Sequence, residues 1–173
     1  MNFGLKRDYS KLRHVRGARE DLRWTVFHLR ASTIDKRAWL SRKGCPEIFL
    51  EELFRYKKQF EFYLYAYVVM PEHIHLVLMP TDTAGISEIM MNIKRRSAWR
   101  MNQCLHRKGQ FWLEDYFDHW ERNSKQTAEA IGYVHNNPVR RKLVARPEDY
   151  PYSSYLAWEH PELCKYKIDR ECF

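Results

Sequence analysis

Two consecutive apolar runs joined by a single turn constrain the fold of this chain more than any other feature. Residues 60–70 are rich in aromatic and β-branched side chains, and Pro71-Glu72 then leads into a second apolar run over residues 73–79. Runs of this length and composition, separated by a turn, predict two neighbouring antiparallel strands. Neither run is long enough to cross a membrane as a helix.

Further strands and helices are expected on both sides of this pair. The expected elements are a strand over residues 23–30, a helix starting at Pro46, a helix over 86–104 followed by Gly109, a strand around 116–120, and a helix capped by Asn123 or Ser124 and stopped by Pro138. This order predicts an α+β fold: a ferredoxin-like split βαβ sandwich, in which an antiparallel sheet carries two helices, followed by a C-terminal helix.

Composition predicts a compact protein with a polyanionic partner. The 173 residues are 45% hydrophobic and 15% aromatic, which excludes a disordered chain. We expect a basic arm over residues 1–20, one domain over 21–158 and a tail over 159–173. The net charge of +8 favours nucleic acid over a membrane surface as the partner, although a basic protein without such a partner is the alternative.

The cysteines and the N-terminus bear on the cellular compartment. Four cysteines lack the paired short spacings of a zinc ribbon or of a disulfide framework, so reduced thiols are expected. The N-terminus is polar and charged, without the apolar segment of an export signal. A cytoplasmic protein that does not contact membranes is therefore expected.

Two separated fragments carry candidate chemistry. His73 and His75 flank one hydrophobic residue, so both imidazoles lie on the same face of a strand. Tyr133 and Asn137 are four residues apart and share a helix face. The extra helix is the available cover for the histidine-bearing face, which would bring these four side chains together. Two imidazoles and an amide oxygen can hold a divalent metal ion on a phosphodiester, which the tyrosine can then attack.

Each fragment also has a structural explanation. His-x-His pairs in strands are often structural, and a residue before proline, such as Asn137, is biased away from helical geometry. His28, His119 and His135 are interpreted as structural, because histidine is often half-buried.

Longer blocks of sequence resemble a known family. The segments YVVMPEHIHLVLMP, FWLEDYFDHWERN and YVHNNPVRRKLVARPEDYPYSSY resemble the three signature blocks of the REP-associated tyrosine transposases. These proteins are a branch of the single-tyrosine HUH nucleases and are related to small insertion-sequence transposases. The segment IMMNIKRRSAWRMNQ is similar to the second helix of the family. The resemblance covers about residues 20–158 in the same order, so 21–158 is identified as an HUH transposase domain.

The resemblance implies a metal-dependent single-stranded DNA endonuclease and strand transferase that acts at hairpin-forming, REP-like repeats. Tyr133 would be the nucleophile of a transesterification that yields a 5′-phosphotyrosine and a free 3′-OH. His73, His75 and Asn137 would hold Mg²⁺ or Mn²⁺. A monomer and a homodimer are both compatible with the resemblance. A hairpin DNA-binding protein without catalytic activity is the alternative, and a relaxase or replication initiator is a third reading.

Two basic clusters are candidates for DNA contacts. Lys94, Arg95 and Arg100 belong to the second expected helix, and Arg140 and Arg141 follow Pro138. Contacts between such residues and phosphates give an affinity that falls steeply with salt concentration. A solvated charged face is the alternative interpretation.

Overall fold

The computed structural model describes residues 22–121 and 123–170, so the expected basic arm, residues 1–20, lies outside the described part. The strands are β1 (Val26–Ser32), β2 (Tyr63–Val69), β3 (His73–Met79) and β4 (Phe117–Glu121). The α-helices are α1 (Cys45–Phe60), α2 (Ile86–Cys104), α3 (Ser124–Arg140) and the short α4 (Tyr155–Glu159). Single turns of 3₁₀ helix are η3 (Ile34–Lys36), η4 (Trp39–Ser41), η5 (Pro147–Asp149) and η6 (Pro161–Leu163).

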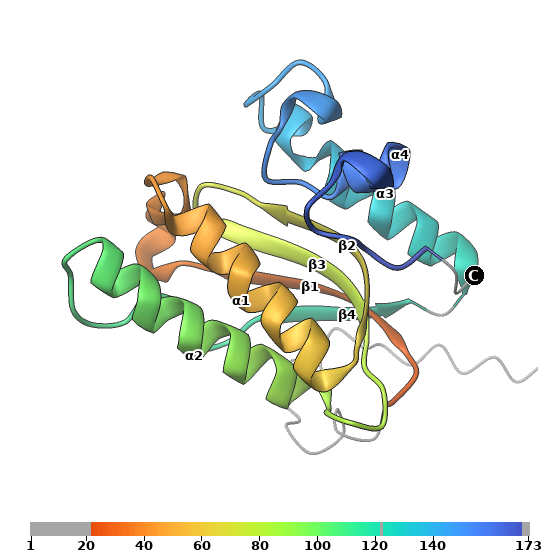
Figure 1. The fold of residues 1–173 in the computed structure, drawn as a ribbon, viewed down its shortest axis with the longest axis horizontal. Helices are drawn as coiled ribbons and strands as arrows, with labels where there is room; N and C mark the ends of the chain where they lie inside the picture. Colours follow the sequence, from red (N-terminus) through yellow and green to blue (C-terminus); the bar gives the residue numbers. More distant parts are fainter. Residues whose placement is uncertain (1–21, 122, 171–173) are drawn as a thin grey trace, which may run out of the picture.

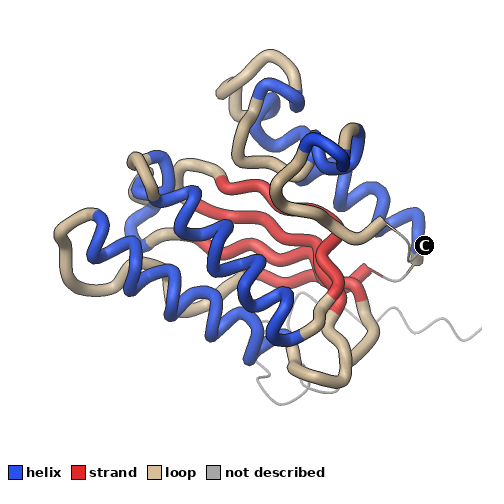
Figure 2. The backbone as a smooth tube through the Cα atoms, in the orientation of Figure 1, coloured by secondary structure: helices blue, strands red, loops and turns tan. Residues whose placement is uncertain are grey.

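The four strands form one sheet in the order β2-β3-β1-β4, and every neighbouring pair is antiparallel. Helices α1 and α2 lie side by side on one face of the sheet, whereas α3 lies on the other face (Figure 1). The strands are therefore sandwiched between two helical layers (Figure 2). This arrangement confirms the predicted split βαβ sandwich with an extra C-terminal helix.

The alternation of side chains along β3 separates the core from the candidate site. Ile74, Leu76 and Leu78 join the core under α1 and α2. Val77 points to the opposite face and packs against Val134 of α3 in a second, smaller core. His73 and His75 share the face of Val77 because side chains alternate with a period of two. The strand thus presents both histidines to α3.

Strand β1 begins later than the sequence predicts. We expected a strand from residue 23, but Trp24 has a positive φ of 56°, a conformation incompatible with an extended strand. The ordered ladder therefore starts at Val26 and continues to Ser32. The apolar and aromatic composition of the preceding residues does not reveal this change of direction.

Helix α3 starts as predicted and ends later than predicted. The Asn123 side chain caps it, because its Oδ1 accepts a hydrogen bond from the backbone N–H of Gln126 at 3.0 Å. The prediction that Pro138 stops the helix is wrong, since α3 continues to Arg140. A proline in the final turn removes only one hydrogen bond there, and Asn137 and Pro138 are both buried. Tyr133 and Asn137 consequently lie on one continuous helix.

The C-terminal segment packs along the outer edge of β2. The backbone N–H of Asp169 donates to Leu64 O at 2.9 Å, and its carboxylate lies 2.9 Å from Lys57 Nζ. The ring of Tyr166 stacks on Phe54 of α1 with centroids 4.6 Å apart. The described part of the expected tail (159–173), residues 159–170, therefore contacts the domain. Of the helices in the described part of the chain, none is both long and apolar enough to cross a membrane.

Candidate active site

The structure gathers the four side chains that the sequence singled out. Asn137 Nδ2 lies 3.3 Å from His75 Nε2, and the rings of His73 and His75 have centroids 4.9 Å apart. The ring of Tyr133 packs edge-on against His75 at 5.5 Å between centroids. His73, His75 and Asn137 are buried, whereas Tyr133 is 38% exposed. The side chains of His73, His75 and Asn137 thus lie in the interior of the site, and the ring of Tyr133 lies partly at the surface.

Both strand histidines are held in the neutral form. Burial is the main cause that lowers the pKa of His73, to about 4, and the positive charge of Arg30 adds to the effect. Burial likewise lowers the pKa of His75 to about 2, with the neighbouring His28 and His73 as further causes. A neutral imidazole keeps a lone pair for a metal ion or a hydrogen-bond donor. The site therefore offers ligands that do not have to release protons at neutral pH.

A carboxylate links the first histidine to the end of α3. Glu72 Oε1 lies 3.2 Å from His73 Nδ1 and 2.6 Å from Arg141 Nη2. This contact leaves Nε2 of His73 as its available ring nitrogen. The neighbouring Arg140 places its guanidinium 5.0 Å from the centre of the Tyr133 ring. Both arginines predicted to contact DNA at this end of the chain therefore lie at the candidate site.

His28 belongs to this site, although its sequence position was interpreted as structural. Its Nε2 lies 3.0 Å from His75 Nδ1, and its ring is 5.6 Å from that of Tyr133. The signal that could have located it is the strand order of a split βαβ sheet, in which β1 neighbours β3. Alternation along β1 then puts His28 on the face of His75. By contrast, His135 contacts Ser154 through Nε2 at 2.9 Å, on the α4 side of the helix.

Arg30 is a second residue that sequence reasoning missed. It is exposed, pairs in register with His75, and shares a strand face with His28. Phe117, which pairs with Arg30 from β4, is 53% exposed. A cation and an exposed aromatic ring thus lie beside the histidines on the half of the sheet formed by β1 and β4.

The basic residues of α2 are separated from this site by the sheet, because α2 covers the opposite face (Figure 1). Lys94 Nζ donates to the carbonyl oxygens of Leu113 and Glu114 at 2.8 and 2.7 Å. Arg100 donates to Glu51 and to the buried Glu52 at 2.7 and 2.9 Å. The five basic residues predicted to contact DNA therefore divide into two groups: Arg140 and Arg141 at the site, and Lys94, Arg95 and Arg100 on the far helix.

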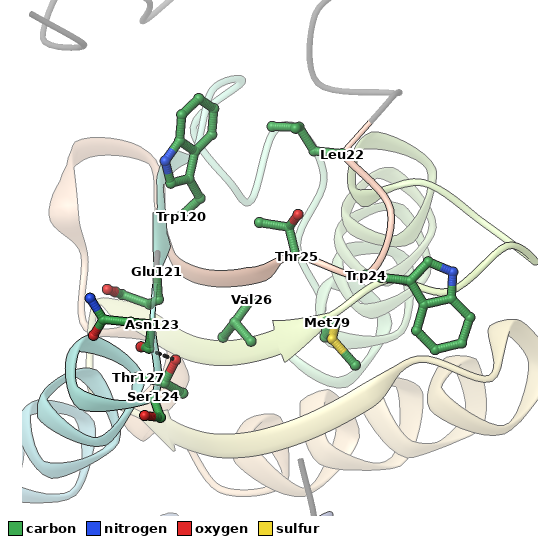
Figure 3. A pocket seen from close by; sticks show the side chains of 10 residues that line it. All are labelled: Leu22, Trp24, Thr25, Val26, Met79, Trp120, Glu121, Asn123, Ser124 and Thr127. Atoms are coloured by element: carbon green, nitrogen blue, oxygen red, sulfur yellow. Dashed lines mark hydrogen bonds between the residues drawn. The ribbon is translucent and has the colours of Figure 1, made fainter. Parts of the chain in front are cut away.

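An open hollow of about 680 Å³ lies between the starts of β1 and α3 and the ends of β3 and β4 (Figure 3). Its lining includes the indoles of Trp24 and Trp120. Val26, which also lines it, precedes His28 by two residues and lies on the same strand face. The hollow thus lies at the end of the sheet: Val26 belongs to the histidine face, whereas Trp120, which pairs with Phe27, belongs to the core face.

His73 and His75 form a site for a divalent metal ion only if the Asn137 amide is the third ligand. Across residues 22–121 and 123–170, no three His, Cys, Asp or Glu side chains converge as a metal site. His73 and His75 supply two buried neutral imidazoles, and Asn137 supplies the third position. Rotation of the Asn137 amide would exchange Nδ2 for Oδ1 next to His75, and the amide oxygen is a suitable metal ligand. The residues present therefore fit an open three-ligand site.

A split βαβ sheet that presents a His-x-His strand to a tyrosine on a covering helix defines the single-tyrosine transposase class. Residues 24–137 match the family described as "Transposase IS200 like". The chain belongs to this family.

Relatives refine the comparison. The REP-associated tyrosine transposase of Escherichia coli (strain K12) is 27% identical over 106 residues, which are 60% of each protein. A relative from Haemophilus influenzae (strain ATCC 51907 / DSM 11121 / KW20 / Rd), placed in the same group, is 26% identical over 113 residues, which are 58% of this chain and 64% of that protein. The match thus spans less than two thirds of these curated relatives.

A solved structure shares the fold. It is a REP-associated tyrosine transposase bound to a REP hairpin, and it superposes with a TM-score of 0.67 at 20% identity over 87% of both chains. This agreement supports the overall architecture described above.

Proposed function

We propose that this protein is a metal-dependent single-stranded DNA endonuclease and strand transferase that acts at hairpin-forming repeats. The observation that carries the proposal is the packing of Tyr133 against His75 while Asn137, one turn later, contacts the same imidazole. A tyrosine, two imidazoles and an amide from two distant segments thus converge at one point, which supports the roles of nucleophile and metal ligands. A protein that only binds DNA has no need of this combination.

Tyr133 would perform the covalent step. Its Oη attacks the phosphorus of the scissile phosphodiester, and the Oη–P bond forms as the bond from phosphorus to O3′ breaks. The tyrosine hydroxyl loses its proton, and the leaving O3′ gains one, so the products are a 5′-phosphotyrosine and a free 3′-OH. The bond energy is retained in the phosphotyrosine, and attack by another 3′-OH rejoins the strand.

His73, His75 and Asn137 would hold Mg²⁺ or Mn²⁺ beside the phosphate. The ion would supply Lewis-acid polarisation of the phosphate oxygens. The protein keeps its two imidazoles neutral through burial, and Glu72 fixes the ring of His73 through Nδ1. These contacts orient the ligands before DNA arrives, which reduces the reorganisation needed at the moment of reaction.

Single-stranded DNA would lie over the β1–β4 half of the sheet and the end of α3. Arg140, Arg141 and Arg30 provide positive charge around the tyrosine, and the exposed Phe117 offers a ring on which an unpaired base can stack. The solved relative described as bound to a REP hairpin supports a hairpin as the partner. Cleavage would then occur in the single-stranded segment beside such a hairpin.

The proposal is tested with labelled hairpin repeats from the genome that encodes this chain, incubated with Mn²⁺ or Mg²⁺ and separated on a denaturing protein gel. We expect a labelled band at the size of the protein, lost with EDTA and lost in Tyr133→Phe. Tyr155→Phe is the matched control, because Tyr155 packs on His135 rather than at the site. Tight hairpin binding without any adduct under either metal would instead establish the non-catalytic DNA-binding alternative.

A further inference from the structure

We propose that His28 is a positioning residue that holds His75 in one tautomer, with its proton on Nδ1 and its Nε2 lone pair directed at the metal position. The inference deepens the proposed function and rests on it. It concerns a residue outside the tyrosine and the three metal-binding positions, contributed by a different strand.

Sheet register places the two rings together. His28 of β1 pairs with Val77, and Arg30 pairs with His75, so His28 and His75 are diagonal neighbours across the β1–β3 ladder. Both point to the face covered by α3. Their nitrogens, Nε2 of His28 and Nδ1 of His75, are 3.0 Å apart, which is hydrogen-bond distance. The contact is therefore set by the backbone of two adjacent strands rather than by a flexible loop.

The hydrogen bonds at the two ring nitrogens of His75 depend on each other, because a neutral imidazole carries only one N–H proton. In the amide orientation of this structure, Asn137 Nδ2 faces Nε2 at 3.3 Å and can only donate, so Nε2 accepts. The proton of a neutral His75 is then on Nδ1, from which it is donated to His28 Nε2. If the Asn137 amide turns its Oδ1 toward a metal ion, the Nε2 lone pair of His75 is already in place for the same ion. This is the arrangement found in protein metal sites, where a ligating histidine donates its other N–H to a fixed acceptor.

An opposite network would use the same atoms. If Asn137 presented Oδ1, Nε2 of His75 would carry the proton, and His28 would donate to Nδ1. That tautomer blocks metal binding until the whole chain of hydrogen bonds reverses. The two networks differ in one measurable property, namely which nitrogen of His75 is protonated.

Long-range ¹H–¹⁵N NMR of the uniformly labelled protein, without metal or DNA, reads this property directly. The His75 signals are assigned by their loss in His75→Gln. We expect the Nδ1–H tautomer in the wild-type protein at pH 7. The Nε2–H tautomer, or an equal mixture of the two, overturns the proposal without the need for any variant at residue 28.

Variants at His28 test the consequence for the metal. We expect His28→Leu to weaken Mn²⁺ binding, measured by calorimetry, by roughly 10–100-fold. His28→Gln should recover much of the loss, because its amide oxygen can accept from Nδ1–H. His119→Leu is the matched control, since His119 lies directly opposite His28 on β4 and is exposed on the same sheet face. It should bind Mn²⁺ as the wild-type protein does.

Melting curves accompany each titration, so that a packing role is separated from a positioning role. A folded His28→Leu protein with wild-type Mn²⁺ affinity overturns the proposal. If His28→Leu does not fold, the tautomer of the wild-type protein and the affinity of His28→Gln decide the question. Failure of the proposed function looks different: the wild-type protein would then bind no Mn²⁺ and form no DNA adduct, whichever tautomer His75 adopts.

Discussion

Glu72 shows how a single residue can serve the candidate site from its periphery. Its carboxylate contacts His73 Nδ1 on one side and Arg141 on the other, so one side chain joins the turn before β3 to the end of α3. Sequence reasoning gave Glu72 no role. It located His73, His75, Tyr133 and Asn137, because each pair lies within one element at a spacing that fixes its face. Contacts between elements follow from tertiary register, which local spacing does not reveal.

The first prediction concerns this carboxylate. Glu72→Ala should weaken Mn²⁺ binding by about tenfold, because His73 loses the acceptor that orients its ring. Glu72→Gln should lose less, since its amide oxygen can still accept from Nδ1–H. Calorimetric titration of both variants measures the difference. Equal losses in the two variants would show that the charge of Glu72, or its pairing with Arg141, matters more than its role as an acceptor.

At the level of elements, basic residues have different surroundings on α2 and at the end of α3. Arg100 of α2 is tied to Glu51 and to the buried Glu52, which also lies near Arg55 and Arg96. Arg140 lies instead over the ring of Tyr133. The sequence shows both clusters equally well, because charge counting does not reveal which arginines have acidic partners. Their assignment to DNA remains a prediction.

A pair of matched variants separates the two clusters. Arg140→Gln should weaken hairpin binding. It should also reduce the slope of log affinity against log salt concentration by about one, the value for the loss of one phosphate contact. Arg100→Gln should leave hairpin binding close to the wild-type value and reduce the free energy of unfolding by about 1 kcal/mol, because a hydrogen bond to a buried carboxylate is lost. Salt titrations of binding and thermal melts measure both effects. A larger loss of hairpin affinity in Arg100→Gln than in Arg140→Gln would place the DNA on the α2 face.

For the whole molecule, strand alternation and helix periodicity were sufficient to predict the sandwich, whereas the strand order β2-β3-β1-β4 was not part of the prediction. The boundaries were less predictable: Trp24 turns out of the extended conformation before β1, and α3 passes through Pro138. At Pro138 packing outweighs local preference, because Asn137 and Pro138 are both buried. Trp24 is exposed, and hydrogen bonds from its backbone N–H to Pro80 O and from its indole to Asp82 accompany its conformation. The late end of α3 matters for the site, because it keeps Asn137 helical and one turn from Tyr133.

Folding also imposes a pH dependence on the whole molecule. Burial lowers the pKa of His28, His73 and His135 to about 4 and that of His75 to about 2. The unfolded chain, with ordinary values near 6.5, therefore binds more protons below that pH, so the free energy of unfolding must fall as the pH drops from about 6.5 towards 4. We expect the melting temperature to be several degrees lower at pH 5 than at pH 7.

Circular dichroism melts at pH 5, 6 and 7 check this expectation. His135→Gln offers a control away from the site, because His135 contacts Ser154 rather than the metal-binding side chains. Its melting temperature should change less between pH 7 and pH 5. A melting temperature that is constant or higher at pH 5 would show that these imidazoles are protonated in the folded protein.

The attachment of the C-terminal segment to β2 has a consequence for how copies of this protein can meet. The outward backbone groups of Leu64, Tyr67 and Val69 are all hydrogen-bonded to the returning chain, through Asp169, Ser154 and the segment from Tyr150 to Tyr152. An edge strand with its ladder already completed gives an incoming strand nothing to pair with. The β2 edge of the sheet is therefore not available for β-pairing with another molecule. The five-residue strand β4 forms the opposite edge, where the sheet of a neighbouring molecule could still pair.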